Sequence, residues 1–412
     1  MNIEELPTQL QYLFTSSQRP SIFSSGTPAL LSSSHTKSTV HGKTAPTALS
    51  NHRSYAYVSD LLNRAKIVFE RYLCELTWHE HTKHVYGEQK TSYIHKIRIP
   101  HTKNHACSLH CGDIHGDIES INALIENFEI TPDMLLLFHG DYIDRGAHSL
   151  EVMCTLLELK LAHFDQVILL RGNHEQGYLF EPLSEHPKLN SLARELYHLF
   201  PHQAEDLLRG FIDVFSTFPL ACIGEFEDEQ HTVACREFWC HGCADLNLDL
   251  RTFTQDTTAH AYCCTMIPQR TPSDEIVYIH PICWNDVDTE GTTAPINRSQ
   301  RFGSLLHRQE LVPYLFEQGF ICVVHGHQHD PGMMLYLKVH NFIARHCAKT
   351  TFSALEEENN TIIPGTVFTL APAPLSNGYG DAFGYSHLTL LHLNSLLQEV
   401  VTLPVFALDK SG

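Results

Sequence analysis

Residues 134–146 read MLLLFHGDYIDRG, an apolar run followed directly by a cluster of polar residues. The apolar part, residues 134–138, has the length and composition of a buried strand. The polar part holds Asp141, Asp144 and Arg145 where that strand would end. In open α/β sheets, ligands bind beyond the carboxyl ends of the strands. The stretch therefore predicts a buried strand that delivers charged side chains to a ligand-binding edge.

The same pattern recurs along the chain. Three further apolar runs end in polar clusters, namely QVILL (166–170) before RGNHE, FWC (238–240) before HG, and FICVV (320–324) before HGHQH. Amphipathic helices are expected between the strands, at residues 117–128, 149–163 and 304–318. Alternating strands and helices are typical of βαβ units and predict an α/β fold. The glycines in each cluster allow sharp turns and a close approach of the backbone to a ligand.

The chain is expected to divide into a leader and one folded domain. Residues 1–55 are rich in Ser, Thr and Pro, which predicts a flexible leader that serves as a linker, a partner-binding tail or a delivery signal. Residues 56–412 are expected to form the domain, with a helix from about residue 58 and an insertion near 337–365. Residues 78–105 hold scattered histidines without ligand spacing and are interpreted as surface or loop.

The charge balance argues against nucleic acid or an anionic membrane as the main partner. The chain has 47 acidic and 28 basic residues, whereas nucleic acids and anionic membranes attract basic surfaces. We therefore expect no nucleic-acid partner. No apolar run approaches the roughly 18 residues of a membrane span. The first residues, MNIEELPTQL, also lack the apolar segment of a secretory signal.

The cysteines indicate a reducing compartment. The 13 cysteines are scattered without the spacing of a disulfide framework, and several lie in apolar runs. This usage predicts a cytoplasmic protein, and delivery into the cytosol of another cell is compatible with it. Cys240 and Cys243 form CHGC, but a structural zinc site needs four ligands and no second CxxC accompanies the pair.

Five polar clusters supply the residue types of a metal centre. Asp113 and His115 lie two residues apart in GDIHG at a strand end, so both can face one ion. Asp141 ends the next strand and can bridge two ions. A second site can be completed by Asn173, His241 and His327. Oxygen and nitrogen ligands without a thiolate suit manganese, iron or zinc better than copper(I).

These motifs resemble the phosphoprotein phosphatase family within the calcineurin-like metallophosphoesterases, over about residues 106–330. The resemblance implies a metallophosphoesterase fold, with a central β-sandwich of mixed sheets flanked by helices and a dimetal site at the carboxyl ends of the strands. It implies two divalent ions, manganese first, with iron or zinc as alternatives. One ion would be held by Asp113, His115 and Asp141, and the other by Asp141, Asn173, His241 and His327.

The resemblance also implies a mechanism. A hydroxide that bridges the two ions would attack the phosphorus directly, without a covalent phosphoenzyme. Arg145 and Arg171 would clamp the phosphate, because a guanidinium fork matches two phosphate oxygens. His174 would protonate the leaving oxygen, and Asp144 would orient its ring and keep it cationic.

Some positions depart from the family pattern. His329 completes a Gly-His-x-His pattern of the wider superfamily and is expected as an additional ligand, whereas His325 is expected to pack or to orient a ligand. The usual third phosphate-facing arginine is missing, and either Arg298 or Arg301 could replace it. The family tyrosine near the C-terminal loop would be Tyr379 or Tyr385.

The expected function is hydrolysis of phosphoserine and phosphothreonine in a phosphoprotein. The first alternative is a protein-tyrosine phosphatase on the same fold, because cleft depth rather than the metal centre sets that choice. A dinucleoside polyphosphate or phosphodiester hydrolase is the second, since GDYIDRG and GNHE are shared with some such enzymes. A binding module without activity is the third, although the intact cluster residues argue against it. The sequence leaves open whether a regulatory subunit exists.

Overall fold

The computed structural model describes residues 54–79, 92–100, 107–127, 130, 134–180, 191–270, 276–288, 302–328, 366–370, 388–394 and 399–405. Several predicted features lie outside these residues, namely the leader up to residue 53, the insertion near 337–365, and Arg298, Arg301, His329, Tyr379 and Tyr385. Among the residues that the structure describes, no helix combines the length and the apolar character that a membrane span requires.

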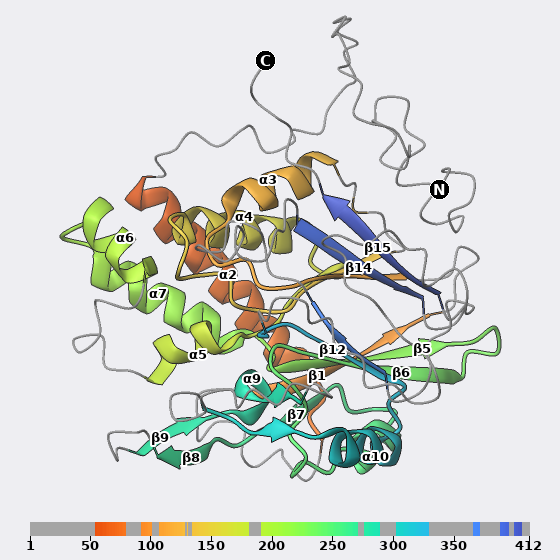
Figure 1. Cartoon of the computed structure of the whole chain (residues 1–412). Helices are drawn as coiled ribbons and strands as arrows, with labels where there is room; N and C mark the ends of the chain where they lie inside the picture. The colour runs from red at the N-terminus through yellow and green to blue at the C-terminus, as the bar shows by residue number, and fades with distance from the viewer. Residues whose placement is uncertain are drawn as a thin grey trace, which may run out of the picture.

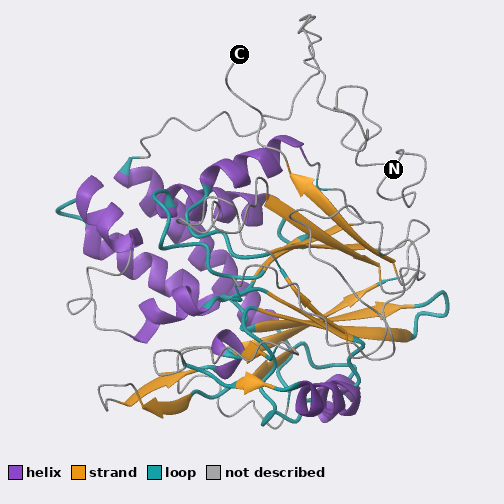
Figure 2. Ribbon diagram, in the orientation of Figure 1, coloured by secondary structure: helices purple, strands orange, loops and turns teal. Residues whose placement is uncertain are grey.

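Two mixed β-sheets form the centre of the domain (Figure 2). The first has the order β13-β12-β6-β5-β1-β7, and its strands are β1 (Tyr93–Ile99), β5 (Ala221–Glu227), β6 (Val233–Cys240), β7 (Ala261–Cys263), β12 (Cys322–His325) and β13 (Thr366–Thr369). The second has the order β15-β14-β2-β3-β4, and its strands are β2 (Cys107–Cys111), β3 (Met134–Phe138), β4 (Val167–Leu169), β14 (Leu388–Asn394) and β15 (Glu399–Val405). Each sheet combines parallel and antiparallel pairs, which confirms the predicted mixed sheets.

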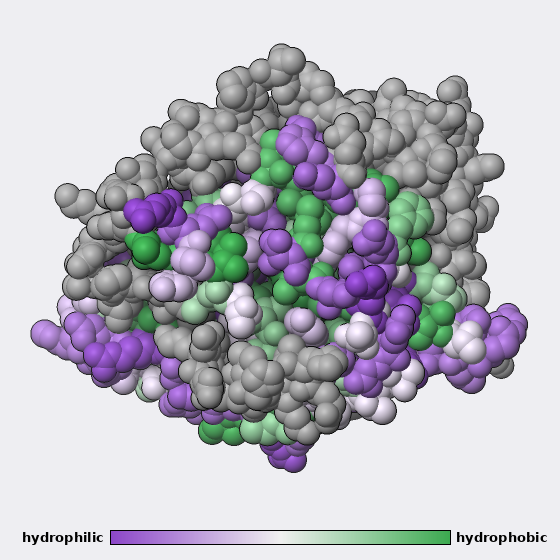
Figure 3. Space-filling view, turned by 90° about the horizontal axis from the view of Figure 1, so that it is seen from below, coloured by the Kyte–Doolittle hydropathy of each residue, from purple (hydrophilic) through white to green (hydrophobic). Residues whose placement is uncertain are grey.

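Helices cover the outer faces of both sheets (Figure 1). The helices packed with the five-stranded sheet are α2 (Tyr55–Glu75), α3 (Ile118–Asn127), α4 (Ser149–Ala162), α6 (Ser191–Leu199) and α7 (Ala204–Thr217). Those packed with the six-stranded sheet are α8 (Arg251–Gln255), α9 (Pro281–Trp284) and α10 (Arg308–Gln318). Helix α5 (Asn173–Phe180) contacts α7 and α9. The face seen in Figure 3 mixes hydrophobic and hydrophilic residues, as is usual for a protein surface.

Strand β3 contributes side chains to the packing on both faces of its sheet. Leu136 and Phe138 pack with the helices, while Leu137 between them packs in the core that separates the two sheets. Successive side chains of a strand point to opposite faces, so a strand buried on both faces reads as a continuous apolar run. The predicted helices at 117–128 and 149–163 are confirmed as α3 and α4.

The third predicted helix, 304–318, begins later than expected. Helix α10 starts at Arg308, because Leu305 and Leu306 form the short strand β11 (Leu305–Leu306). This strand pairs with β10 (Asp286–Val287) in parallel. The pairing ties the segment before α10 to the residues that follow Trp284.

The interpretation of residues 78–105 as surface or loop is wrong for residues 93–99. These residues form β1, which pairs with β5 on one side and with β7 on the other. The apolar pattern was obscured by Lys96, which is buried because its ammonium donates to the carbonyl oxygens of Phe253 (2.8 Å) and Asp256 (2.5 Å). The hairpin of β8 (Ile267–Arg270) and β9 (Ile276–Ile279) was also not predicted.

The register of the strands explains why the polar clusters meet. In the five-stranded sheet, Cys111, Phe138 and Leu169 lie side by side at the carboxyl ends of three parallel strands. In the six-stranded sheet, Cys240 lies opposite His325 at the ends of β6 and β12. Each cluster that follows these residues therefore starts at the same edge of the sandwich, as the sequence predicted.

Candidate metal centre

The loops beyond these strand ends bring the predicted ligands together. Asp113, His115, Asp141 and His241 are each no more than 1% exposed, although all four are polar. Two groups have ligand atoms within 4.8 Å of one another: His115, Asp141 and His174, and Asp141, His241 and His327. Asp141 belongs to both groups, which fits the predicted bridging position.

Hydrogen bonds orient the first group. His115 directs Nδ1 to the carbonyl oxygen of Ile143 at 2.8 Å. Its Nε2 therefore faces the carboxylates, 3.5 Å from Asp141 Oδ2 and 3.9 Å from Asp113 Oδ2. A ring nitrogen bonded to a backbone carbonyl fixes the tautomer and leaves the other nitrogen as a metal ligand.

The second group converges on Asn173 Oδ1. That oxygen lies 2.9 Å from His241 Nε2 and 2.9 Å from His327 Nδ1. His241 is oriented in the same way as His115, since its Nδ1 lies 2.7 Å from the carbonyl oxygen of His139. His241 Nε2 also lies 3.2 Å from Asp141 Oδ1, so this nitrogen, the amide oxygen and the carboxylate face one point.

The donor set fits divalent cations. Asp141 Oδ2 is buried and has no hydrogen-bond partner among the described residues. Burial alone would raise the pKa of Asp141, but His241 and His174 hold it well below its usual range, so the carboxylate is ionised. A buried carboxylate oxygen without a hydrogen bond is costly unless a cation pairs with it. Carboxylate, imidazole and amide ligands are those that manganese, iron and zinc accept.

The cluster loops hold unusual backbone conformations. Left-handed φ angles occur at His115 (46°), Asp141 (53°), Asp144 (67°), Arg145 (62°) and His327 (66°). Such angles are uncommon for residues other than glycine and gather at functional sites, where the surrounding structure holds them in place. Part of that support is a hydrogen bond from His115 N to the carbonyl oxygen of Asp141, 2.8 Å long.

Two glycines allow the backbone to approach the carboxylates. A Cβ atom at Gly172 would lie 2.2 Å from Asp141 Oδ1, and one at Gly326 would lie 2.3 Å from Asp113 Oδ1. Both distances are far shorter than any real contact of a Cβ atom. The backbones of these two glycines therefore lie directly against carboxylates of the cluster, where any larger residue would collide with them.

His174 and Asp144 form the predicted pair. His174 Nδ1 lies 2.9 Å from Asp144 Oδ2, and the ring packs edge-on against His115 at 4.7 Å between centroids. Burial lowers the pKa of His174, but the carboxylates of Asp141 and Asp144 raise it by more, so its pKa lies above the ordinary value. The half-buried Arg145 acts in the opposite direction on that pKa.

Glu175 was not recognised from the sequence, although RGNHE contains it. Its carboxylate accepts three backbone N–H bonds of 2.9 Å, from Asp141, Tyr142 and Gly172. Burial raises the pKa of Glu175 to about 7. The residue therefore joins the loop after β3 to the loop after β4 and fixes the backbone of Asp141. Asp286 was also missed, and its Oδ1 lies 3.7 Å from His327 Nε2.

Arg171 does not lie where a phosphate clamp requires. Its side chain is 0% exposed, and its guanidinium donates to Ser92 Oγ (3.0 Å) and to the carbonyl oxygens of Ser216 (2.6 Å) and Phe218 (2.8 Å). Burial lowers its pKa to about 10, so the group is still charged at neutral pH. Arg171 therefore holds three segments together, and these contacts do not support the phosphate-clamp role that was predicted for it.

Replacing Arg171 by methionine is expected to lower the free energy of unfolding by about 2–4 kcal/mol, because each buried acceptor left without a donor costs about 1–3 kcal/mol. Guanidinium unfolding measures the change, and Arg209→Met on the exposed face of α7 is the matched control, since Arg209 is 67% exposed. Unchanged stability together with a raised KM would restore the clamp interpretation.

This chain is similar to known proteins in sequence pattern and in fold. The family model for calcineurin-like phosphoesterases matches residues 108–331, just over half of the chain. A protein serine/threonine phosphatase from Saccharomyces cerevisiae is 17% identical, with a TM-score of 0.52, and the match covers 87% of this chain and 92% of that chain. This likeness supports the fold.

Two other solved structures match less well. A metallophosphoesterase from Sphaerobacter thermophilus is 12% identical with a TM-score of 0.37, over 73% of this chain and 89% of that chain. A cold-active protein-tyrosine phosphatase from a Shewanella species is 14% identical with a TM-score of 0.39, over 76% of this chain and 82% of that chain.

Proposed function

The chain belongs to the calcineurin-like phosphoesterase family, and from this premise we propose that it is a protein phosphatase that hydrolyses phosphoserine and phosphothreonine monoesters. The observation that supports this most is the His174–Asp144 pair, 2.9 Å apart, beside the shared carboxylate of Asp141. A proton donor next to a metal centre serves a reaction in which a poor leaving group, such as a serine alkoxide, must be protonated.

The proposed cofactors are two divalent ions, with manganese first and iron or zinc as alternatives. Asp113, His115 and Asp141 would hold one ion, and Asp141, Asn173, His241 and His327 would hold the other. His329 is proposed as an additional ligand. When bound, such ions supply a nucleophile at neutral pH and neutralise the charge of the phosphate.

The remaining roles fall to residues beside the ligands. His174 is the proposed general acid: because Nδ1 bonds to Asp144, Nε2 is the nitrogen that would give its proton to the leaving oxygen, and it lies 3.9 Å from Asp141 Oδ2. Arg145 is the proposed phosphate clamp, since its side chain is half-buried in the loop that also carries Asp144. We propose that Arg298 or Arg301 supplies the second guanidinium, and that Tyr379 also contacts the phosphate.

Turnover of matched phosphopeptides tests the proposed substrate. Peptides that differ only in phosphoserine, phosphothreonine or phosphotyrosine should release phosphate in a manganese-dependent way, fastest from the first two. A phosphodiester and diadenosine tetraphosphate serve as the controls. Preference for phosphotyrosine would replace the proposal with the tyrosine phosphatase alternative, and turnover of the controls alone would move the substrate class to nucleotides.

A further inference from the structure

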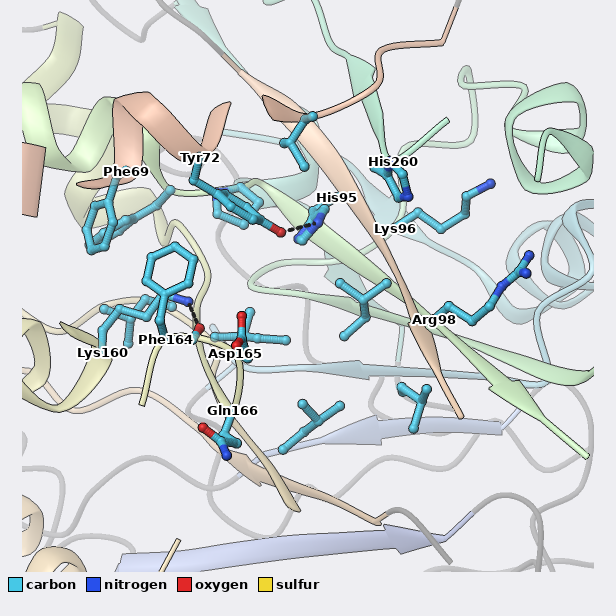
Figure 4. A pocket seen from close by; sticks show the side chains of 18 of the residues that line it. Phe69, Tyr72, His95, Lys96, Arg98, Lys160, Phe164, Asp165, Gln166 and His260 are labelled. Carbon is cyan, nitrogen blue, oxygen red and sulfur yellow. Dashed lines mark hydrogen bonds between the residues drawn. The ribbon is translucent and has the colours of Figure 1, made fainter. Parts of the chain in front are cut away.

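A cavity of about 650 Å³ lies apart from the metal centre, beside β1 (Figure 4). Its apolar lining includes Ile97 and Ile99 of β1, Leu135 of β3, Ile168 of β4 and Phe164 from the loop before β4. It also meets the last turn of α2 at Tyr72 and Glu75. None of the proposed metal ligands that the structure describes lines it. We call this cavity the β1 trough.

The β1 trough follows an open strand edge. Strand β7 pairs only with residues 93–95 of β1, and the next contact on that side is a 2.8 Å hydrogen bond from Lys96 N to the carbonyl oxygen of His260. Beyond it, no described residue pairs with the backbone of Arg98 on the side away from β5. Residues 95–100 all line the trough, so it continues the line of β7 along this edge. An unpaired strand edge is a template for an additional strand.

The two faces of β1 differ in character. Ile97 and Ile99 pack toward the core between the sheets, whereas Lys96 and Arg98 lie on the opposite side of the strand from Phe164 (Figure 4). The Arg98 side chain is 43% exposed, and its guanidinium lies 3.8 Å from Glu225 and 3.5 Å from Glu227. These distances exceed the roughly 2.7–2.9 Å of a charge-assisted hydrogen bond, so Arg98 has donors left for another carboxylate.

We propose that the β1 trough binds an extended segment of a partner protein in which an acidic residue lies between two apolar residues. The segment would add a strand in the place that β7 leaves open, with its central residue opposite Arg98. Residues directly opposite in a sheet share a face, so the central side chain meets Arg98 and its two neighbours enter the trough beside Ile97 and Ile99. The partner is thereby held at a site apart from the metal centre. This tether raises the effective concentration of the partner at the metal centre without blocking catalysis.

The test is a binding titration with fluorescein-labelled seven-residue peptides. Each has Glu at the centre, with Val, Ile, Leu or Phe on both sides, and a matched set has Lys at the centre. At least one Glu peptide should bind wild-type protein about tenfold more tightly than its Lys counterpart, a factor that one well-placed ion pair can supply. Arg98→Glu should reverse this preference, and Leu135→Arg should abolish binding of both sets.

The controls separate docking from folding. Both variants should keep wild-type hydrolysis of p-nitrophenyl phosphate, as should Ile67→Arg on α2, where the native side chain is 66% exposed outside the trough. Absence of binding by every Glu peptide would overturn the proposal, as would binding that survives both substitutions. Sedimentation that shows a wild-type dimer and a monomeric Leu135→Arg variant would also overturn it, because the occupant would then be a second copy of the chain.

Discussion

Asp141→Asn is expected to abolish phosphate release and to weaken metal binding. Asp141 is the only residue shared by the two ligand groups found among the described residues. The substitution keeps the size of the side chain but removes its charge, and it places an amide opposite the imidazoles of His115 and His241. Removal of one preorganised electrostatic group costs roughly 10²–10³ in kcat, and loss of a bridging charge should reach the upper end or exceed it.

Metal content and turnover should be measured together for this variant. Plasma mass spectrometry of the purified protein gives the stoichiometry, and titration with manganese gives the affinity. Asp213→Asn is the matched control, because Asp213 lies on α7, is 49% exposed and pairs with Lys66 at 2.7 Å. Wild-type turnover and metal content in Asp141→Asn would refute the bridging position of this carboxylate.

The candidate metal centre could be anticipated because its proposed ligands follow directly from strand ends. Cys111 and Phe138 end neighbouring parallel strands in register, so Asp113 and Asp141 must emerge at one edge. The flanking glycines support the same conclusion, since Gly172 leaves room only for a hydrogen in contact with Asp141. Local sequence was enough here, because each proposed ligand among the described residues lies within four residues of the end of a strand.

Arg171 could not be assigned in this way, because its direction depends on segments far away in the chain. Its guanidinium binds Ser92, Ser216 and Phe218, which come from residues before β1 and from the end of α7. The side chain of a residue between a strand and a helix can point toward the site or away from it. The spacing of residues in the sequence does not distinguish these two directions.

Strand β1 was missed for a related reason. Lys96 and Arg98 give the segment a polar appearance. Lys96 is nevertheless buried, and its ammonium donates to two carbonyl oxygens from the region of α8. Only tertiary contacts supply the acceptors that make burial of this cation tolerable. The β1 trough could not be predicted from the sequence either, because it depends on the pairing between β1 and β7 stopping at His95.

His174→Asn is expected to reduce kcat for phosphoserine peptides by roughly 10²–10⁴, the usual contribution of a general acid. Asparagine cannot transfer a proton at neutral pH, whereas the cationic ring favoured by Asp144 and Asp141 can. Metal content should stay at the wild-type level. The matched control is His148→Asn, since His148 is 53% exposed at the start of α4.

The leaving group decides between the two roles that the geometry allows for His174. Its nitrogen lies close enough to His115 and Asp141 to belong to a ligand group, so a ligand role is a real alternative. A general acid matters most for a poor leaving group such as an alkoxide and least for p-nitrophenolate, which departs without a proton. The loss in His174→Asn should therefore be much smaller with p-nitrophenyl phosphate than with phosphoserine. Equal losses with both substrates, accompanied by loss of metal, would make His174 a ligand instead.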